Sequence, residues 1–170
     1  MAGGQDWRLA AAVWEAGGLG SVPAGMLDAA ALEQQLTQLS AATNNPWNVN
    51  FFCHSSPPPN PAGEQRWAQT LRPYYEAFRA DSSAIPEGPS RKPFDADCAA
   101  VLALFRPAVV SFHYGLPEAS LLDRVKATGA TVLSSATTVE EALWLQAQGA
   151  DAVIAQGLEA GGHRGHFLSD

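Results

Sequence analysis

The chain has 170 residues, 46% of them apolar, and a net charge of −7. This composition fits one ordinary domain, allows a sizeable core and argues against a disordered polypeptide. The acidic balance, without any basic run, excludes the usual signature of a nucleic-acid or anionic-membrane binder. No apolar window is long enough to span a membrane and no signal peptide is visible, so we expect a cytoplasmic protein. Cys53 and Cys98 match no metal spacing, and we expect free thiols and no metal site.

Capping residues and prolines predict where helices begin and end. The predicted N-caps are Asp6 and Asp95, together with a capping box formed by Thr138 and Glu141, and a further helix is expected to start near Asp28. Pro117 is expected to start a further helix, which Gly129 ends. The prolines of residues 57–61 predict a long loop, with only a weak helical signal in residues 65–79. Residues 81–93 are again expected to form a loop.

Five short apolar segments are predicted strands. They lie at residues 19–22, 47–52, 109–112, 131–136 and 152–156. Val109, Val132 and Val153 are 23 and 21 residues apart, which is the length of one strand–helix unit. The segments are apolar without clean alternation, as in parallel strands that are buried on both faces. The pattern predicts an α/β fold, either a barrel or a doubly wound sheet.

The number of strands favours part of a barrel. A closed barrel of this type needs eight strands and about 250 residues. A doubly wound domain places its glycine-rich phosphate loop after the first strand, whereas Gly17-Gly18-Leu19-Gly20 precedes a predicted strand. The chain starts as if a strand had just ended and stops in a loop. We therefore expect a single domain over residues 1–170 that forms a partial or shortened barrel.

Candidate functional residues follow the ends of the predicted strands, where parallel sheets bind ligands. Residues 155–166 combine four glycines with two histidines, an arginine, a glutamate and Gln156. An imidazole there can exchange a proton near neutral pH, although a mobile glycine turn with surface histidines explains the composition equally well. His113 leaves another strand end and is a candidate for the substrate pocket. Asn48 and Asn50 share a strand face, and either amide can bind a ligand or satisfy a backbone group.

Several motifs together resemble the nitronate monooxygenase family, formerly called 2-nitropropane dioxygenase. They are residues Gly17–Ser21, Asn48–Phe51, Val110–Pro117, Ser134–Thr138 and Gln156–Gly165. The resemblance covers essentially the whole chain, and its last motif is the most specific. It implies a TIM (β/α)8 barrel that binds FMN and oxidises alkyl nitronates with O2. This chain would supply the second to sixth strands, the N-terminal to central part of that barrel.

The resemblance also implies roles for individual residues. The Gly-Gly-His-Arg-Gly context makes His163 the catalytic base or anion anchor. The flavin contacts fall on Asn50, Gln156, Gly161 and the loop of Met1, Ala2 and Gly3. The loops that hold the flavin phosphate follow the seventh and eighth strands of the family's barrel. Tight FMN binding is therefore expected to require those barrel segments or a partner chain.

Two other functions compete with this one. A flavin-dependent enoyl-acyl-carrier-protein reductase shares the barrel and the glycine–histidine loop. A non-catalytic remnant of a truncated gene is the hypothesis from outside the enzymes, because five strands leave two unpaired sheet edges. The physiological nitronate and the oligomeric state stay open at this level.

Overall fold

The computed structural model describes residues 3–81 and 92–168. By its internal contacts the chain divides into two compact units. The first contains Met1–Ser55 and Arg91–Asp170, and the second contains Ser56–Ser90. Most of the loop expected at 81–93 lies outside the described residues.

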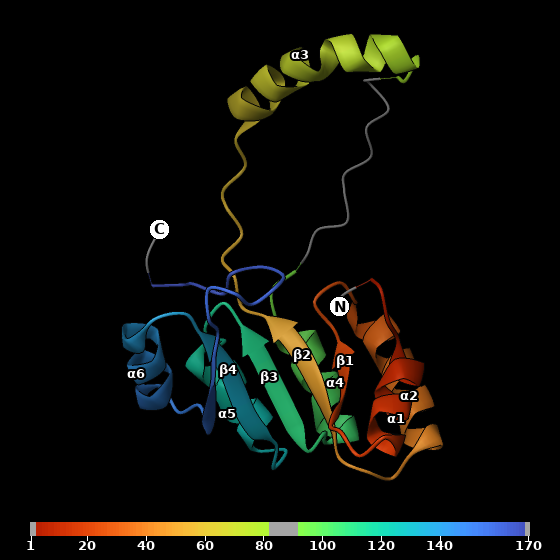
Figure 1. The fold of residues 1–170 in the computed structure, drawn as a ribbon, viewed down its shortest axis with the longest axis vertical. Helices are drawn as coiled ribbons and strands as arrows, with labels where there is room; N and C mark the ends of the chain where they lie inside the picture. The colour runs from red at the N-terminus through yellow and green to blue at the C-terminus, as the bar shows by residue number, and fades with distance from the viewer. Residues whose placement is uncertain (1–2, 82–91, 169–170) are drawn as a thin grey trace. The chain divides into compact units, whose positions relative to one another are not determined.

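The first unit is built on one parallel sheet. Its strands are β1 (Gly20–Pro23), β2 (Trp47–Phe52), β3 (Val109–His113), β4 (Thr131–Ala136) and β5 (Ala152–Ala155). They lie in the order β1-β2-β3-β4-β5, so each strand pairs with its neighbours in sequence (Figure 1). All five predicted strands are confirmed, with their ends within one residue of the expected positions.

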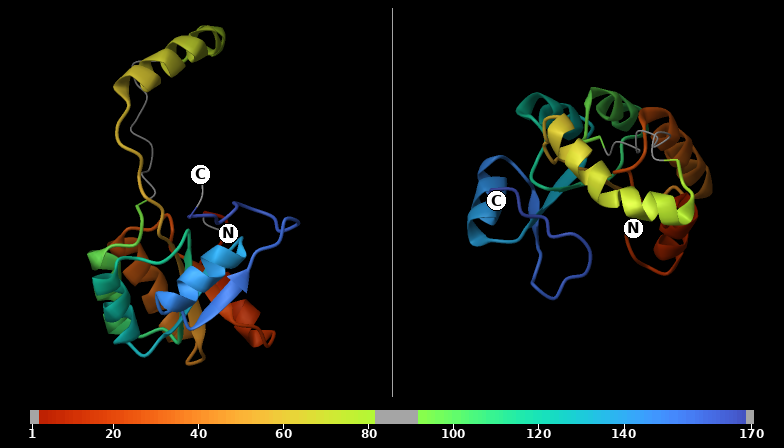
Figure 2. Two further views of the ribbon diagram at one scale, coloured as in Figure 1. Left: turned by 90° about the vertical axis from the view of Figure 1, so that its left-hand side faces the viewer. Right: turned by 90° about the horizontal axis from the view of Figure 1, so that it is seen from above.

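Helices connect the strands and follow one another along the outside of the sheet. They are α1 (Trp7–Glu15), α2 (Ala29–Ala42), α4 (Ala96–Phe105), α5 (Ala119–Lys126) and α6 (Val139–Ala147). Seen from above, these helices form an arc around the strands (Figure 2). A doubly wound domain carries helices on both faces of its sheet, whereas a barrel carries them only on the outside. Consecutive strand order and an outer arc of helices are therefore the arrangement of part of a (β/α) barrel.

Local capping explains where most of these helices begin. The side chains of Asp6, Asp28 and Asp95 each accept a backbone N–H at the helix start, and Thr138 with Glu141 forms the predicted capping box. The expectation for Pro117 was wrong. Glu118 occupies the N-cap position of α5 with non-helical backbone angles, φ −51° and ψ 147°, and without a capping hydrogen bond from its side chain, so the helix begins only at Ala119.

The second unit contains a helix that begins at the end of the proline-rich segment. α3 spans Pro61–Phe78, which is 18 residues, so the weak helical signal was right. The expected loop is confirmed only for the residues before Pro61 and does not extend into this segment. Asn60 caps the helix by accepting the N–H of Gly63, and Pro61 lies in the first turn, where its missing N–H has no helical partner to lose. The helix continues through Pro73 and ends at Arg79, which adopts a left-handed conformation with φ 50°.

The two faces of the sheet carry different chemistry. On the outer face, Val22, Val49, Val110 and Val132 stand in register across four strands and are at most 1% exposed. They belong to the core that also contains the buried leucines of α2. On the inner face, Ser21 pairs with Asn48, and Pro23, Asn50 and Ser111 stand in one row. The inner faces of β2 and β3 are therefore polar, yet Asn48 and Ser111 are buried there, as expected for strands that are buried on both faces.

The sheet ends at β1 and β5. All four residues of β5 are exposed, and among the described strands only β4 pairs with it. Val139 and Leu143, on the apolar side of α6, are 75% and 61% exposed. The end of the arc at α6 and β5 therefore presents uncovered apolar surface.

Cys53 and Cys98 are free thiols. None of the helices in the described part of the chain is long and apolar enough to cross a membrane. Within residues 3–81 and 92–168, His, Cys, Asp and Glu side chains do not gather in threes at a position that could hold a metal ion.

Candidate ligand-binding and catalytic site

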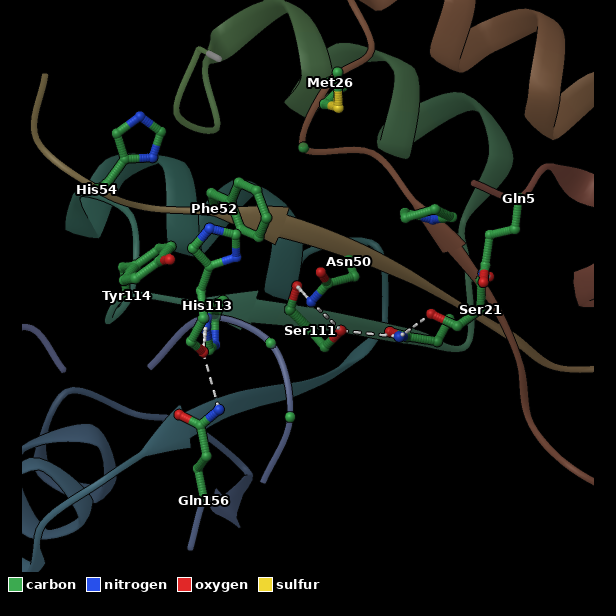
Figure 3. A pocket seen from close by; sticks show the side chains of 16 residues that line it. Gln5, Ser21, Met26, Asn50, Phe52, His54, Ser111, His113, Tyr114 and Gln156 are labelled. Atoms are coloured by element: carbon green, nitrogen blue, oxygen red, sulfur yellow. Dashed lines mark hydrogen bonds between the residues drawn. The ribbon is translucent and has the colours of Figure 1, made fainter. Parts of the chain in front are cut away.

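A cavity of about 860 Å³ lies where the strands end and the loops begin. Its lining includes Asn50 and Phe52 from β2, Ser111 and His113 from β3, and His163 from the loop that follows β5 (Figure 3). This volume is in the range of small-molecule and cofactor sites, and the carboxyl ends of parallel strands are where barrels place them. The cavity is therefore the candidate site of the molecule.

The structure brings most of the predicted site residues to this cavity. The predicted residues that line it are Asn50, His113, Gln156, Gly161 and His163. Met1 and Ala2 lie outside the described residues. Gly3 does not line the cavity, although a Cβ at Gly3 would lie 3.5 Å from the sulfur of Met26, which does line it.

A row of hydrogen-bonded side chains forms the floor of the cavity. The Asn48 Nδ2 group donates to Ser21 Oγ and to Ser111 Oγ, both at 2.8 Å. The Asn50 Nδ2 group donates to Ser111 Oγ at 2.9 Å and to the Ser111 carbonyl at 3.3 Å (Figure 3). The Asn48 Oδ1 atom is buried without a hydrogen-bond partner. Sequence alternation placed the two asparagines on one face but gave no indication that Ser21 and Ser111 join them.

Gln156 fixes the loop that carries His163. Its Nε2 group donates to the His163 carbonyl at 3.0 Å, and its Oε1 atom accepts the Gly165 N–H at 2.8 Å. One carboxamide thus bonds the loop backbone on both sides of Arg164. The imidazole of His163 is exposed and lines the cavity, and the hydrogen bonds from Gln156 and His113 engage its backbone carbonyl rather than its ring. The loop is therefore held by its backbone while the imidazole remains available to a ligand.

His113 supports the same loop from the neighbouring strand end. Its Nε2 atom lies 3.2 Å from the His163 carbonyl, and its Nδ1 atom lies 2.9 Å from Ser135 Oγ. Because a carbonyl only accepts, Nε2 carries the hydrogen, and in the neutral ring Nδ1 accepts the Ser135 hydroxyl. Burial lowers the pKa of His113, while the bond to the His163 carbonyl acts in the opposite direction. A Cβ at Gly165 would clash with the His113 ring, so only glycine fits where the loop crosses it.

Aromatic rings that the sequence analysis missed form one wall of the cavity. The Tyr114 ring centroid lies 4.4 Å from that of His113 and 5.6 Å from that of Phe52. His54 lies beside both Tyr114 and Phe52, with centroids 6.2 Å and 6.3 Å away. Tyr114 adopts φ +68°, which is unusual for a bulky residue and typical of constrained functional loops. Phe52 pairs with His113 across β2 and β3, a register that only the structure shows.

Glu141 holds the far end of the loop. Its Oε2 atom accepts the Thr137 N–H at 2.6 Å, and its Oε1 atom accepts the Phe167 N–H at 2.8 Å. Burial raises the pKa of Glu141, but the hydrogen bonds from the backbone N–H groups of Thr137 and Phe167 outweigh it and hold the pKa below its usual value. The loop is thus tied to the start of α6 by an ionised carboxylate.

With this geometry in view, comparison with known proteins identifies the family. The family model for nitronate monooxygenase matches residues 1–170. The chain belongs to the nitronate monooxygenase family. A nitronate monooxygenase of Paraburkholderia phytofirmans is 43% identical over 100% of this chain and 47% of its own length. One from Pseudomonas aeruginosa is 40% identical over 98% of this chain and 48% of its own length. The chain thus spans about half the length of the curated relatives it matches.

Solved structures agree with this assignment. A nitroalkane oxidase from Streptomyces ansochromogenes is 39% identical, with a TM-score of 0.83 over 100% of this chain and 48% of that chain. FabK from Thermotoga maritima is 26% identical, with a TM-score of 0.64 over 98% of this chain and 42% of that chain. Family membership and the partial barrel fold are therefore both established.

Proposed function

We propose that this chain forms the part of an FMN-dependent enzyme that holds the cofactor ring and the catalytic base for oxidation of alkyl nitronates with O2. The observation that carries the proposal is the convergence of Asn50, His113, Gln156, Gly161 and His163 on one cavity at the strand ends. These residues are up to 113 positions apart in sequence. Family membership supports the same reaction.

The cavity fits the ring of a flavin better than its phosphate. Its volume, its aromatic wall and its floor of amide and hydroxyl groups suit a flat, polar heterocycle. The described residues that line it include no Lys or Arg, and such residues commonly neutralise a bound phosphate. Asn50 and Gly161 would hold the ring, while the phosphate would be bound by other parts of the barrel.

His163 is proposed to act on the substrate directly. As a base, its imidazole takes the α-proton of a nitroalkane, and in its protonated form it orients the anionic nitronate. Gln156 and His113 fix the backbone of His163 from two sides, which sets the position of the base. A bound flavin supplies the ring that accepts electrons and reacts with O2.

We further propose that more strands close the barrel, supplied by a continuing chain or by a partner. All four residues of β5 are exposed, and Val139 and Leu143 of α6 are exposed as well. Such an edge pairs readily with another strand. Half-length coverage of the relatives is consistent with this completion.

The test compares His163→Ala with His166→Ala. The two histidines are three residues apart and both exposed, but only His163 lines the cavity. Flavin absorbance and nitronate turnover are measured for the chain alone and for the chain fused to the remaining half of the Paraburkholderia phytofirmans relative. We expect His163→Ala to lower turnover by about 100-fold or more, the usual contribution of a general base, and to leave flavin bound.

Two further measurements decide between the possible outcomes: the turnover of the His166→Ala control and the reduction of the flavin by NAD(P)H. His166→Ala should retain full turnover. Undiminished turnover in His163→Ala would refute the role of His163. A flavin that NAD(P)H bleaches rapidly in stopped-flow mixing, and that nitronates do not, would favour an enoyl reductase instead. No flavin in either form of the protein would favour the non-catalytic remnant.

A further inference from the structure

Helix α3 presents an exposed apolar face. Trp67, Tyr74 and Phe78 are 63%, 63% and 81% exposed, and none of the residues of α3 is buried. The helix also contains Pro73 in its interior, which removes a backbone hydrogen bond and disfavours a helix. Most of the stability of a helix in a protein comes from packing of its apolar face. We therefore expect α3 to be stabilised by a contact outside the described part of the chain.

The apolar residues of this face have the spacing of a helix that pairs with another helix. Trp67, Leu71, Tyr74 and Phe78 follow one another at intervals of four, three and four residues. This interval places all four side chains in one stripe along the helix. The sequence from Trp67 to Phe78 has no charged residue within the stripe itself. Such a stripe packs side by side with a second helix at a shallow crossing angle.

The charges at the two ends of the stripe favour a second copy of α3 in antiparallel orientation. Glu64 precedes the stripe in the first turn, and Arg79 follows it at the C-cap. In an antiparallel pair centred between Leu71 and Tyr74, each Glu64 lies beside the Arg79 of the second copy. In a parallel pair the two Glu64 carboxylates would face each other and repel. The arrangement of opposite charges is therefore satisfied twice in the antiparallel pair.

The area of the stripe is sufficient for a specific dimer. At the exposures of Trp67, Tyr74 and Phe78, pairing would remove roughly 100–150 Å² of each side chain from water, out of the 150–250 Å² of a fully buried aromatic residue. Over both copies these rings bury roughly 600–900 Å², and Leu71 and Tyr75 beside them bring the total close to the roughly 1,000 Å² that a specific interface needs.

We propose that this protein dimerises through α3, which pairs with α3 of a second copy about a two-fold axis. In such an interface both copies contribute the same residues: Trp67 packs on Phe78 of the second copy, and Leu71 packs on Tyr74 of the second copy. Trp and Tyr are the residues that most often dominate the energy of protein interfaces. α3 is inserted between β2 and α4, outside the parallel sheet, so this contact uses neither edge of the sheet.

Sedimentation equilibrium tests the pairing, in the chain alone and in the fused form described above, in which the edge at β5 is covered. We expect both forms to dimerise, and Leu71→Asp to be monomeric because it introduces a charge into the stripe. Gln69→Asp is the matched control, since Gln69 is exposed on the opposite side of α3, and it should remain a dimer. Urea denaturation of the sheet unit should be unchanged in both variants, because α3 belongs to the other unit.

A charge swap tests the antiparallel register, and it also covers the case in which Leu71→Asp unfolds α3 itself. Glu64→Arg and Arg79→Glu each bring like charges together and should weaken dimerisation by about fivefold, whereas the double variant should restore it. Single variants that dimerise as tightly as wild type would overturn the antiparallel pair. A protein that stays monomeric also overturns the proposal, as does a dimer that Leu71→Asp leaves intact and that Leu143→Asp in α6 disrupts.

Discussion

The outer and inner faces of the sheet are built from alternate residues of the same strands, but the outer face forms the core and the inner face lines the cavity. On β3, Phe112 belongs to the outer face, where it is fully buried against other aromatic rings. Ser111, one residue earlier, belongs to the inner face and bonds two carboxamides. The outer face thus removes apolar area from water, while the inner face keeps polar groups oriented.

This difference implies that different residues of the same strands determine the stability of the fold and the binding of a ligand. Burial of a large apolar side chain contributes several kcal/mol, whereas a neutral hydrogen bond contributes about 1 kcal/mol. Substitutions on the outer face should therefore lower stability strongly. Substitutions on the inner face should act mainly on the ligand.

The largest expected effect is that of Phe112→Ala. The side chain is 0% exposed, and its ring centroid lies 5.3 Å from that of Phe94 and 6.2 Å from that of Phe51. Removing it leaves a cavity in the core, and we expect the free energy of unfolding to fall by about 3–5 kcal/mol. Urea denaturation measures this change. Phe78→Ala is the matched control, because Phe78 is 81% exposed and its loss should change stability by no more than about 0.5 kcal/mol. Equal losses in the two variants would contradict the role of the outer face.

The outer face was largely predictable from sequence, because its signals are local. Apolar segments of strand length located all five strands, and a hydroxyl or carboxylate before each helix located most helix starts. The start of α5 was missed by two residues, since Glu118 has non-helical backbone angles and no side-chain capping bond that the sequence would signal. The helical signal of α3 was weak in the sequence because the prolines of residues 57–61 cannot extend a helix, although Pro61 at the start of α3 was a usable signal.

The inner face was predictable only in part, because its contacts join distant segments. The Gly-Gly-His-Arg-Gly stretch predicted His163, and the structure places it on the cavity. The hydrogen bonds from Asn48 and Asn50 to Ser111 cross 63 and 61 residues and depend on the register of β2 and β3. The register itself is set by packing on the outer face. Composition and periodicity carry no information about such a pairing, so Ser111 was not a candidate.

Glu141 offers a smaller and pH-dependent test, since it links α6 on the outer side to the loop that carries His163. Its lowered pKa means that the carboxylate stabilises the folded state above the usual value of 4.5 and loses this contribution as the pH falls through the lowered pKa. We expect Glu141→Gln to lower the free energy of unfolding by about 1–2 kcal/mol at pH 7. The difference from wild type should shrink below pH 4.5. Chemical denaturation across pH measures it.

Glu140→Gln is the control for this prediction. Glu140 lies in the first turn of the same helix but is exposed. Its variant should match wild type to within about 0.5 kcal/mol at every pH. A deficit in Glu141→Gln that persisted undiminished in strong acid would show that shape, rather than charge, holds the loop to α6.

The smallest expected change in stability comes from Ser111→Ala, and it tests the comparison most directly because Ser111 adjoins Phe112. Loss of the hydroxyl leaves the Asn50 amide its bond to the Ser111 carbonyl and leaves the Asn48 amide its bond to Ser21. Each carboxamide therefore keeps a partner, and we expect the free energy of unfolding to fall by about 1 kcal/mol. Urea denaturation of Ser111→Ala beside Phe112→Ala gives both values under identical conditions. A loss at Ser111 as large as that at Phe112 would mean that the polar row on the inner face is itself a principal part of the core.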